Sequence, residues 1–184
     1  MKIVNWKLII LITLVIITAV LWYFVHDKSA QSAQNKSENY PFINPELPKR
    51  YDDPDLNFFV DYSEGFVVNA TAEESVKVLV FSKNNSDESF QIFIMPYDEP
   101  GPITPERILI DQPEMVIKNP QTIEIAGEET LVFFSTDPDL GDVREVWFVH
   151  PSTTLGASGH LYQASTYAKY DELLSKVMAT FRFK

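Results

Sequence analysis

Two histidines in the last quarter of the chain are the residues best suited to acid–base or metal chemistry. His150 and His160 flank the segment 151–159, and each lies next to an apolar run. Imidazole changes its charge near neutral pH and also ligates metals. Because a loop between two strands brings their ends together, the two rings could approach one another. With Asp142 or Glu145 they could then bind a metal or activate a hydroxyl group.

The hydroxyl groups nearest to this pair in the sequence belong to Ser152, Thr153, Thr154 and Ser158. Neither a Gly-x-Ser-x-Gly nor a His-Glu-x-x-His signature accompanies them. The simpler interpretation is two ordinary histidines at the edges of a loop. We therefore predict no catalytic residue, and an envelope hydrolase or metal-dependent enzyme using His150 and His160 stays open as an alternative.

Three aspartates, Asp137, Asp139 and Asp142, lie close together in the run Asp-Pro-Asp-Leu-Gly-Asp. Carboxylate oxygens are the ligands that calcium prefers. The run lacks the spacing and the distal glutamate of an EF-hand, and aspartate, proline and glycine also build an ordinary hairpin turn. We predict no metal and no cofactor here, with a calcium-responsive module using residues 137–142 as a second alternative.

Composition excludes several classes of function. All 26 acidic residues lie beyond His26, whereas Lys2 and Lys7 precede it. Such an acidic surface repels phosphate backbones, so we expect no nucleic-acid partner. With 0 cysteines the chain has no disulfide, no thiolate metal site and no lipidated cysteine. The chain also contains only 6 glycines and no glycine-rich phosphate loop, which argues against nucleotide binding.

The N-terminal region has the pattern of a transmembrane helix. An uncharged apolar run extends from Leu8 to Val25, and at about 1.5 Å per residue it spans roughly 27 Å, close to the thickness of a bilayer core. Interfacial aromatic residues stand at its ends. Positions along the predicted span include Leu8, Ile12, Val15, Ala19, Trp22 and Val25.

A cleaved signal peptide is the competing interpretation, because residues 29–34 include small side chains. The apolar region of a signal peptide has only about 7 to 15 residues, so we favour an uncleaved anchor. Lys2 and Lys7 place the N-terminus in the cytoplasm by the positive-inside rule. We predict a signal-anchor helix in residues 1–28, a proline-containing linker in 29–50 and an extracytoplasmic domain in 51–184, held at a bacterial plasma membrane.

The sequence after residue 50 predicts a domain with a sheet and two helices. Short β-rich runs separated by turn residues predict seven or eight strands, with residues 57–61 and 65–68 as a first pair and later hairpins around 83–88 and Gly127. Thr104 and Pro105 predict the start of a helix that ends before Pro113. Apolar residues from Lys169 to Phe181 recur at helical spacing. The fold class is α+β, a largely antiparallel sheet flanked by helices.

Two parts of this domain are similar to a known family. Residues 57–62 and 65–68 resemble the opening strands of PsbP-like domains. Residues 161–166, Leu173-Leu174 and residues 180–183 resemble their last strand and helix. The resemblance covers residues 51–184, and the family's common Tyr-Pro pair is Tyr62-Ser63 here. It implies an antiparallel sheet between helices in a family that usually binds or scaffolds.

The founding member of that family is an extrinsic subunit of photosystem II, and no functional residue of it matches this chain. We therefore expect a non-enzymatic, membrane-anchored domain that binds or scaffolds another envelope protein or a glycan. An exposed aromatic cluster could provide such a surface, although alternating aromatic residues in strands are more often core. The aromatic residues considered are Tyr97, Trp147, Phe148, Tyr162, Tyr167 and Tyr170.

Overall fold

The structure is a computed structural model, and it describes residues 46–99, 101–137, 141–151 and 159–184. The predicted span from Leu8 to Val25 and most of the predicted linker lie outside these ranges. Asp139 and the four hydroxyl residues of segment 152–158 also lie outside them. Within the described ranges, no helix is both long and apolar enough to cross a membrane.

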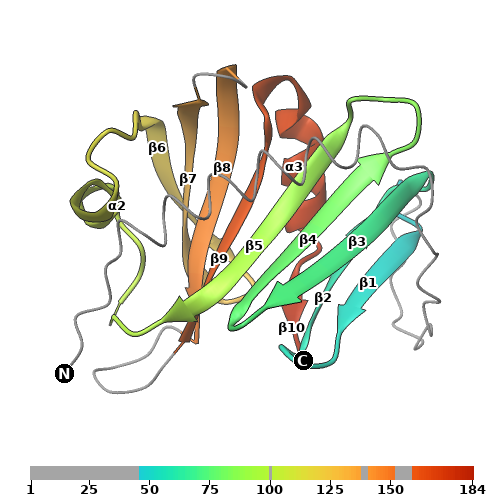
Figure 1. Ribbon diagram of the computed structural model, residues 1–184, viewed down its shortest axis with the longest axis horizontal. Coiled ribbons are helices and arrows are strands. Elements are labelled where there is room, and N and C mark those ends of the chain that lie inside the picture. The colour runs from blue at the N-terminus through green and yellow to red at the C-terminus, as the bar shows by residue number, and fades with distance from the viewer. Residues whose placement is uncertain (1–45, 100, 138–140, 152–158) are drawn as a thin grey trace. The chain divides into compact units, whose positions relative to one another are not determined.

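The main element is a seven-stranded sheet in the order β3-β4-β5-β9-β8-β7-β6 (Figure 1). Every neighbouring pair in it is antiparallel, as predicted for the fold class. Its strands are β3 (Phe66–Glu73), β4 (Val76–Lys83), β5 (Ser89–Tyr97), β6 (Lys118–Ile125), β7 (Glu128–Asp137), β8 (Gly141–His150) and β9 (Gly159–Tyr167).

A second sheet has three strands, β1 (Lys49–Asp53), β2 (Phe58–Tyr62) and β10 (Arg182–Phe183), with β2 in the middle. The predicted pairing of residues 57–61 with 65–68 is wrong, because β2 pairs with β1 and β10 whereas β3 pairs with β4. All five residues of β2 are buried, while the second half of β3 is exposed. The two runs therefore need different surroundings, and they belong to different sheets.

The two predicted helices are present, with bounds that the sequence only approximates. Helix α2 (Pro105–Asp111) begins at the predicted cap, where the Thr104 side chain accepts a hydrogen bond from the Arg107 amide. The predicted helix 169–181 is shorter than expected: a 3₁₀ turn, η1 (Ala168–Tyr170), leads into α3 (Asp171–Met178). Phe181 follows in a turn closed by its amide on the Met178 carbonyl, and β10 begins directly after it.

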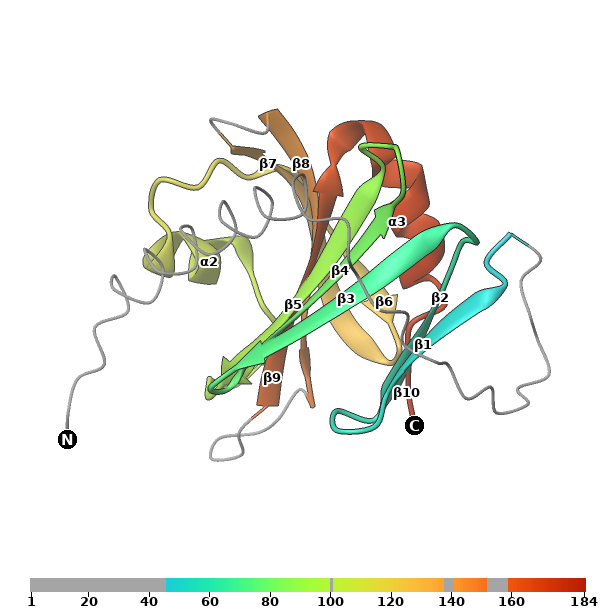
Figure 2. The same ribbon diagram turned by 45° about the vertical axis from the view of Figure 1, so that its right-hand side comes forward.

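Apolar side chains form a separate core on each side of the large sheet. The larger core joins one face of the sheet to α3 and the small sheet, and Phe58, Tyr162 and Phe181 lie at its centre. The smaller core packs Ile108 of α2 against Phe133 and Trp147 on the opposite face. Figure 2 shows the small sheet on one side of the large sheet and α2 on the other. The expected helical cover is confirmed on both faces.

The hairpins predicted from local turn signals are confirmed. β4 and β5 pair around residues 84–88, and β6 pairs with β7 around Ala126 and Gly127. Both of the latter residues have positive φ, at 54° and 87°, as a two-residue hairpin turn requires. β1 starts at Lys49, and Leu47 is buried in the larger core, so chain assigned to the end of the linker packs with the domain.

A buried ion pair links the two sheets. Asp53, at the end of β1, has no exposed surface, and its carboxylate lies 2.5 Å from the Lys77 ammonium on β4. The same carboxylate accepts hydrogen bonds from the amides of Asp55 and Leu56 and from the Tyr51 hydroxyl. Because every oxygen has partners, the charge is compensated away from water.

Candidate functional site

The two histidines singled out in the sequence lie side by side. His150 ends β8 and His160 is the second residue of β9, and the two are register partners across that strand pair. Directly opposed residues in an antiparallel pair point to the same face. Both rings therefore project on the side of the sheet that holds the larger core. The expectation that they approach one another is confirmed.

A third residue, which the sequence did not indicate, completes a polar row with the histidines. Glu128 opens β7, and its carboxylate lies 2.7 Å from His150 Nδ1. On the ring's face, Phe183 of β10 stacks on His150 with 3.4 Å between ring centroids. Burial first, and then the charge of His150, lower the pKa of His160. We name Glu128, His150 and His160 the histidine row.

The carboxylates expected beside the histidines do not take part. Asp142 lies near the start of β8, whereas His150 ends the same strand. Side chains alternate between the two faces along a strand. Glu145 is five residues before His150 on β8, so its side chain points to the opposite face. The proposed combination of the histidine pair with Asp142 or Glu145 is therefore wrong. The carboxylate that binds His150 is that of Glu128.

Glu145 has a different and unusual environment. It is buried on the face of the sheet that holds the smaller core. Its carboxylate accepts hydrogen bonds from the Ser135 hydroxyl at 2.9 Å and from Trp147 Nε1 at 3.0 Å. Burial raises its pKa to about 7, against the two hydrogen bonds, which act to lower it. A buried carboxyl that titrates near neutrality is a candidate for function or for pH-dependent stability.

Of the aspartate run, the structure describes Asp137, which ends β7, and Asp142, the second residue of β8. Asp137 pairs in register with Gly141, and the Asp142 carboxylate binds the Lys118 ammonium at 2.8 Å and the Thr136 hydroxyl at 2.9 Å. These hydrogen bonds lower the pKa of Asp142. A calcium ion would have to displace Lys118 from it. Across the described ranges, no group of three or more His, Cys, Asp or Glu side chains is placed to hold a metal ion.

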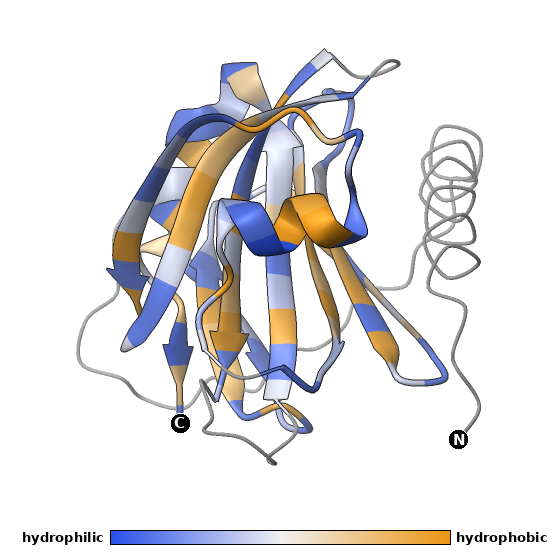
Figure 3. Cartoon of the chain, turned by 90° about the vertical axis from the view of Figure 1, so that its left-hand side faces the viewer, coloured by the Kyte–Doolittle hydropathy of each residue, from blue (hydrophilic) through white to orange (hydrophobic). Residues whose placement is uncertain are grey.

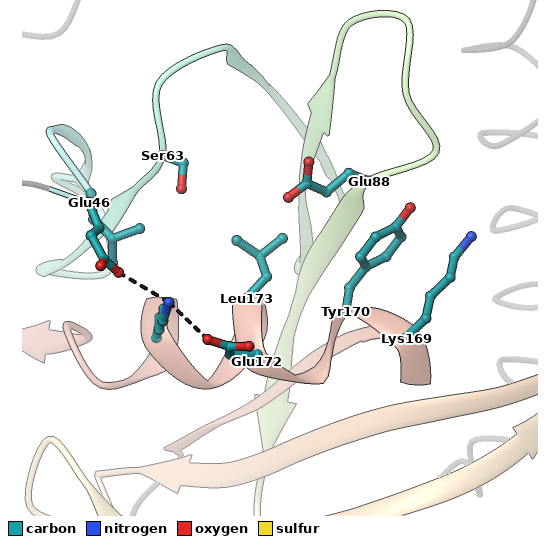
Figure 4. A pocket seen from close by; sticks show the side chains of 9 residues that line it. Glu46, Ser63, Glu88, Lys169, Tyr170, Glu172 and Leu173 are labelled. Atoms are coloured by element: carbon teal, nitrogen blue, oxygen red, sulfur yellow. Dashed lines mark ion pairs between the residues drawn. The ribbon is translucent and has the colours of Figure 1, made fainter.

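A pocket of about 350 Å³ lies beside the start of α3 (Figure 4). Lys176 lines it and binds Glu46 at 3.1 Å and Glu172 at 3.0 Å. Lys169, also in the lining, binds Asp87. Because both cations already bind carboxylates, Lys176 and Lys169 offer no free positive charge to a ligand in this pocket.

A second pocket, of about 500 Å³, lies between the first residues of β6 and α3. Arg144 lines it, with its guanidinium 4.5 Å from the centre of the Phe134 ring. Arg144 Nε lies 2.9 Å from the Asp171 carboxylate as an ion pair, although it lacks hydrogen-bond geometry. Its cation is thus also neutralised. Neither pocket is lined by the histidine row.

The clearest exposed feature is apolar and lies on α2. Four large hydrophobic side chains are exposed in the described part of the chain, and three of them lie within residues 109–116: Leu109 at 41%, Ile110 at 74% and Val116 at 48%. Figure 3, which looks onto α2, shows a hydrophobic stretch of this helix between hydrophilic ends. We name these three residues the α2 surface. The fourth, Ile123, is on β6.

Sequence reasoning missed the α2 surface, although a signal for it exists. Ile108, Leu109 and Ile110 are consecutive, and at about 100° per residue they spread over roughly 200° of the helix circumference. A helix lying on a sheet cannot bury such a wide arc. The structure buries Ile108 and leaves the other two in water.

The aromatic residues considered as a binding cluster are mostly core. Tyr97, Trp147, Phe148 and Tyr162 are buried. Tyr167 and Tyr170 are half-buried, and their rings meet edge to face at 6.5 Å. The described aromatic side chains therefore form no broad exposed platform for a glycan.

Comparisons with known proteins give a similarity of fold alone. No protein-family model matches the sequence, and no curated protein matches it. The solution structure of cyanobacterial PsbP from Synechocystis sp. PCC 6803 has a TM-score of 0.46 and 14% identity, over 80% of this chain and 98% of that one. A crystal structure from Bacteroides thetaiotaomicron VPI-5482 has a TM-score of 0.44 and 11% identity, over 74% of this chain.

This chain spans about half of the Bacteroides protein, 48% of its length. A cyanobacterial PsbP is thus among the solved structures to which this chain is similar. No function transfers from identities this low.

Proposed function

We propose that this chain is a membrane-anchored, extracytoplasmic binding domain that engages another envelope protein through the α2 surface. The observation that carries the proposal is the grouping of three of the four exposed large hydrophobic residues on and next to one helix. Single exposed apolar residues scattered over a monomer are ordinary, whereas several within one short segment are typical of an interaction site.

The geometry around α2 supports a rigid surface. Thr104 caps the helix, and Ile108 anchors it to the sheet. The segment after the helix is fixed by the Met115 amide, which donates to the Gln112 carbonyl at 3.0 Å. A partner would therefore meet preformed side chains and would order little backbone on binding.

The anchor is the second part of the proposal and rests on the sequence. The apolar run from Leu8 to Val25, preceded by Lys2 and Lys7, supports an N-in helix. An anchored domain meets its partners close to the bilayer, so that even a small contact surface is effective through the raised local concentration.

Site-specific photo-crosslinking tests the binding proposal. A photoreactive amino acid at Ile110 of the full chain, in its native membrane, is expected to give a discrete adduct. The same label at Ile123, which is exposed to 46%, is the matched control, and it should give little. Adding Leu109→Asp and Val116→Asp should remove the adduct at Ile110. Equal adducts from Ile110 and Ile123 would contradict the proposal.

An envelope hydrolase remains the second candidate, favoured by the histidine row. Glu128 bound to His150 Nδ1 is an arrangement in which a carboxylate orients a general base. Phe183 covers one face of that ring, which limits access from that side. Hydrolysis of activated esters by the purified full chain, lost in both His150→Gln and His160→Gln, would favour this candidate over binding alone.

A further inference from the structure

We propose that the partner of the α2 surface is a basic amphipathic protein segment, in which apolar side chains are bordered by lysine or arginine. This inference rests on the proposed function and adds the chemical class of the partner. It is carried by the charges that surround Leu109, Ile110 and Val116.

Two exposed glutamates border the α2 surface. Glu106 precedes Ile110 by four residues, so the two side chains are neighbours on one side of the helix. Glu114 is two residues before Val116. Neither glutamate forms an ion pair with any residue in the described ranges. Both charges are therefore available to a partner.

The basic residue of α2 does not offset these charges. Arg107 is bound on two sides, by the Glu99 carboxylate and by the Asp111 carboxylate at 2.9 Å. Its side chain is only 19% exposed. The three residues carry a net charge of one negative unit, so Arg107 neither attracts an acidic partner nor neutralises Glu106 and Glu114.

Glu106 and Glu114 form an acidic rim, which discriminates between three possible occupants of the α2 surface: a second copy of the chain, an anionic membrane and a basic protein segment. A second copy in a two-fold dimer would place the same acidic rims against each other. An anionic leaflet would likewise meet Glu106 and Glu114 with like charge. A segment with apolar residues between basic ones matches both the apolar centre and the rim.

A surface of three apolar side chains suits a short segment rather than a whole domain face. An amphipathic helix presents side chains at intervals of three or four residues, which suits a groove or ridge made by a few apolar side chains. Basic residues flanking those positions would then lie against Glu106 and Glu114. Apolar contacts would supply affinity, and the charges would supply selectivity and a faster association.

Two synthetic helical peptides of equal length and identical leucine face test the chemical class, one flanked by lysine and one by glutamate. Binding is measured by fluorescence anisotropy to the full chain in nanodiscs of zwitterionic phosphatidylcholine. The lysine peptide should bind and the glutamate peptide should not. Equal binding of the two peptides, or no binding of the lysine peptide, would overturn the inference.

Matched neutralisations separate the rim from the overall acidity of the chain. Glu106→Gln with Glu114→Gln should weaken binding of the lysine peptide roughly threefold to thirtyfold. Glu73→Gln with Glu74→Gln removes the same charge at the β3–β4 turn, on the edge of the sheet that β3 forms. This control should change binding less than twofold, because distant charges are screened by salt. An equal loss in both double variants would show a general charge effect and overturn the inference.

The crosslink from Ile110 distinguishes failure of this inference from failure of the proposed function. If the adduct forms and its yield is unchanged by Glu106→Gln with Glu114→Gln, the surface binds a partner of another class and only the inference fails. An adduct with the mass of two copies of this chain, or a label captured by anionic lipid, also overturns it. If no adduct forms above that from Ile123, the proposed function itself fails.

Discussion

His150 and His160 are register partners on adjacent strands, so that two imidazoles share one end of the sheet, and the ring of Phe183 stacks on that of His150. Glu128 binds His150, whereas His160 is influenced chiefly by burial. The two rings therefore have different surroundings although they are cross-strand neighbours. A difference of this kind has a measurable consequence for pH-dependent stability.

The stability of the domain should fall as pH falls through the titration of His160. Its folded-state pKa is lowered by burial and by His150, so the unfolded chain binds the proton more tightly. The contribution of His160 to the free energy of unfolding is complete above the unfolded-state pKa of about 6.5 and is lost as pH decreases through the folded-state value. For one proton the loss is at most about 1.4 kcal/mol per pH unit. Urea unfolding of wild type and His160→Gln between about pH 8 and about pH 5 measures this contribution as a difference. A pH-independent difference would contradict it.

Glu145 should act in the opposite direction. Because its folded-state pKa is raised to about 7, its contribution to stability is present below the unfolded-state value and is lost as pH rises through about 7. Glu145→Gln should therefore be more stable than wild type at about pH 8, by about 3 kcal/mol at most, with the gain declining toward about pH 4.5.

Chemical denaturation at these two pH values measures the effect, and Glu73→Gln on exposed β3 is the control, expected to change stability by less than about 0.5 kcal/mol. A destabilised Glu145→Gln at high pH would show that the ionised carboxylate, held by Ser135 and Trp147, is the favoured form.

The ion pair between Asp53 and Lys77 should contribute strongly to the docking of the small sheet. Lys77→Met leaves a fully buried carboxylate without its cation, which costs about 3 to 5 kcal/mol. Asp53→Asn with Lys77→Met should recover part of this loss, because no charge then remains buried. Lys49→Met is the control, since Lys49 lies 3.9 Å from exposed Glu64, and it should change stability by less than about 1 kcal/mol. Similar losses in the two single lysine variants would contradict the assignment.

Local signals in the sequence predicted those elements whose partners are close along the chain. Thr104 and Pro105 fix the start of α2 by capping and by a preset φ angle, and Gly127 permits the turn between β6 and β7. The approach of His150 to His160 followed from a loop joining two strands. Each of these depends on neighbours within a few residues or on a single connection.

The features that the sequence did not reveal depend on distant pairings. β10 contains two residues and pairs with β2, where Arg182 lies opposite Phe59, and no local pattern encodes that contact. The place of Glu128 beside His150 depends on the register between β7 and β8. Lys49–Asp53 has a polar composition without alternation, so β1 forms because β2 offers it an edge.

Membrane anchoring by residues 1–28 is the remaining prediction. Full-length chain should stay in the membrane pellet after alkaline carbonate washing, and intact mass should include Met1 and exclude cleavage near Ala33. Ile12→Asp with Val15→Asp places two charges in the predicted span, each costing about 2.5 to 3.5 kcal/mol on insertion, and should release the chain or block its export.

Ser29→Asp with Ser32→Asp adds the same charges in the predicted linker and serves as the control, which should remain anchored. Protease added outside the cytoplasmic membrane should degrade the domain and spare the N-terminus, as the positions of Lys2 and Lys7 require. A soluble product beginning after Ala33 would instead establish a cleaved signal peptide, and the α2 surface would then act without the local concentration that an anchor provides.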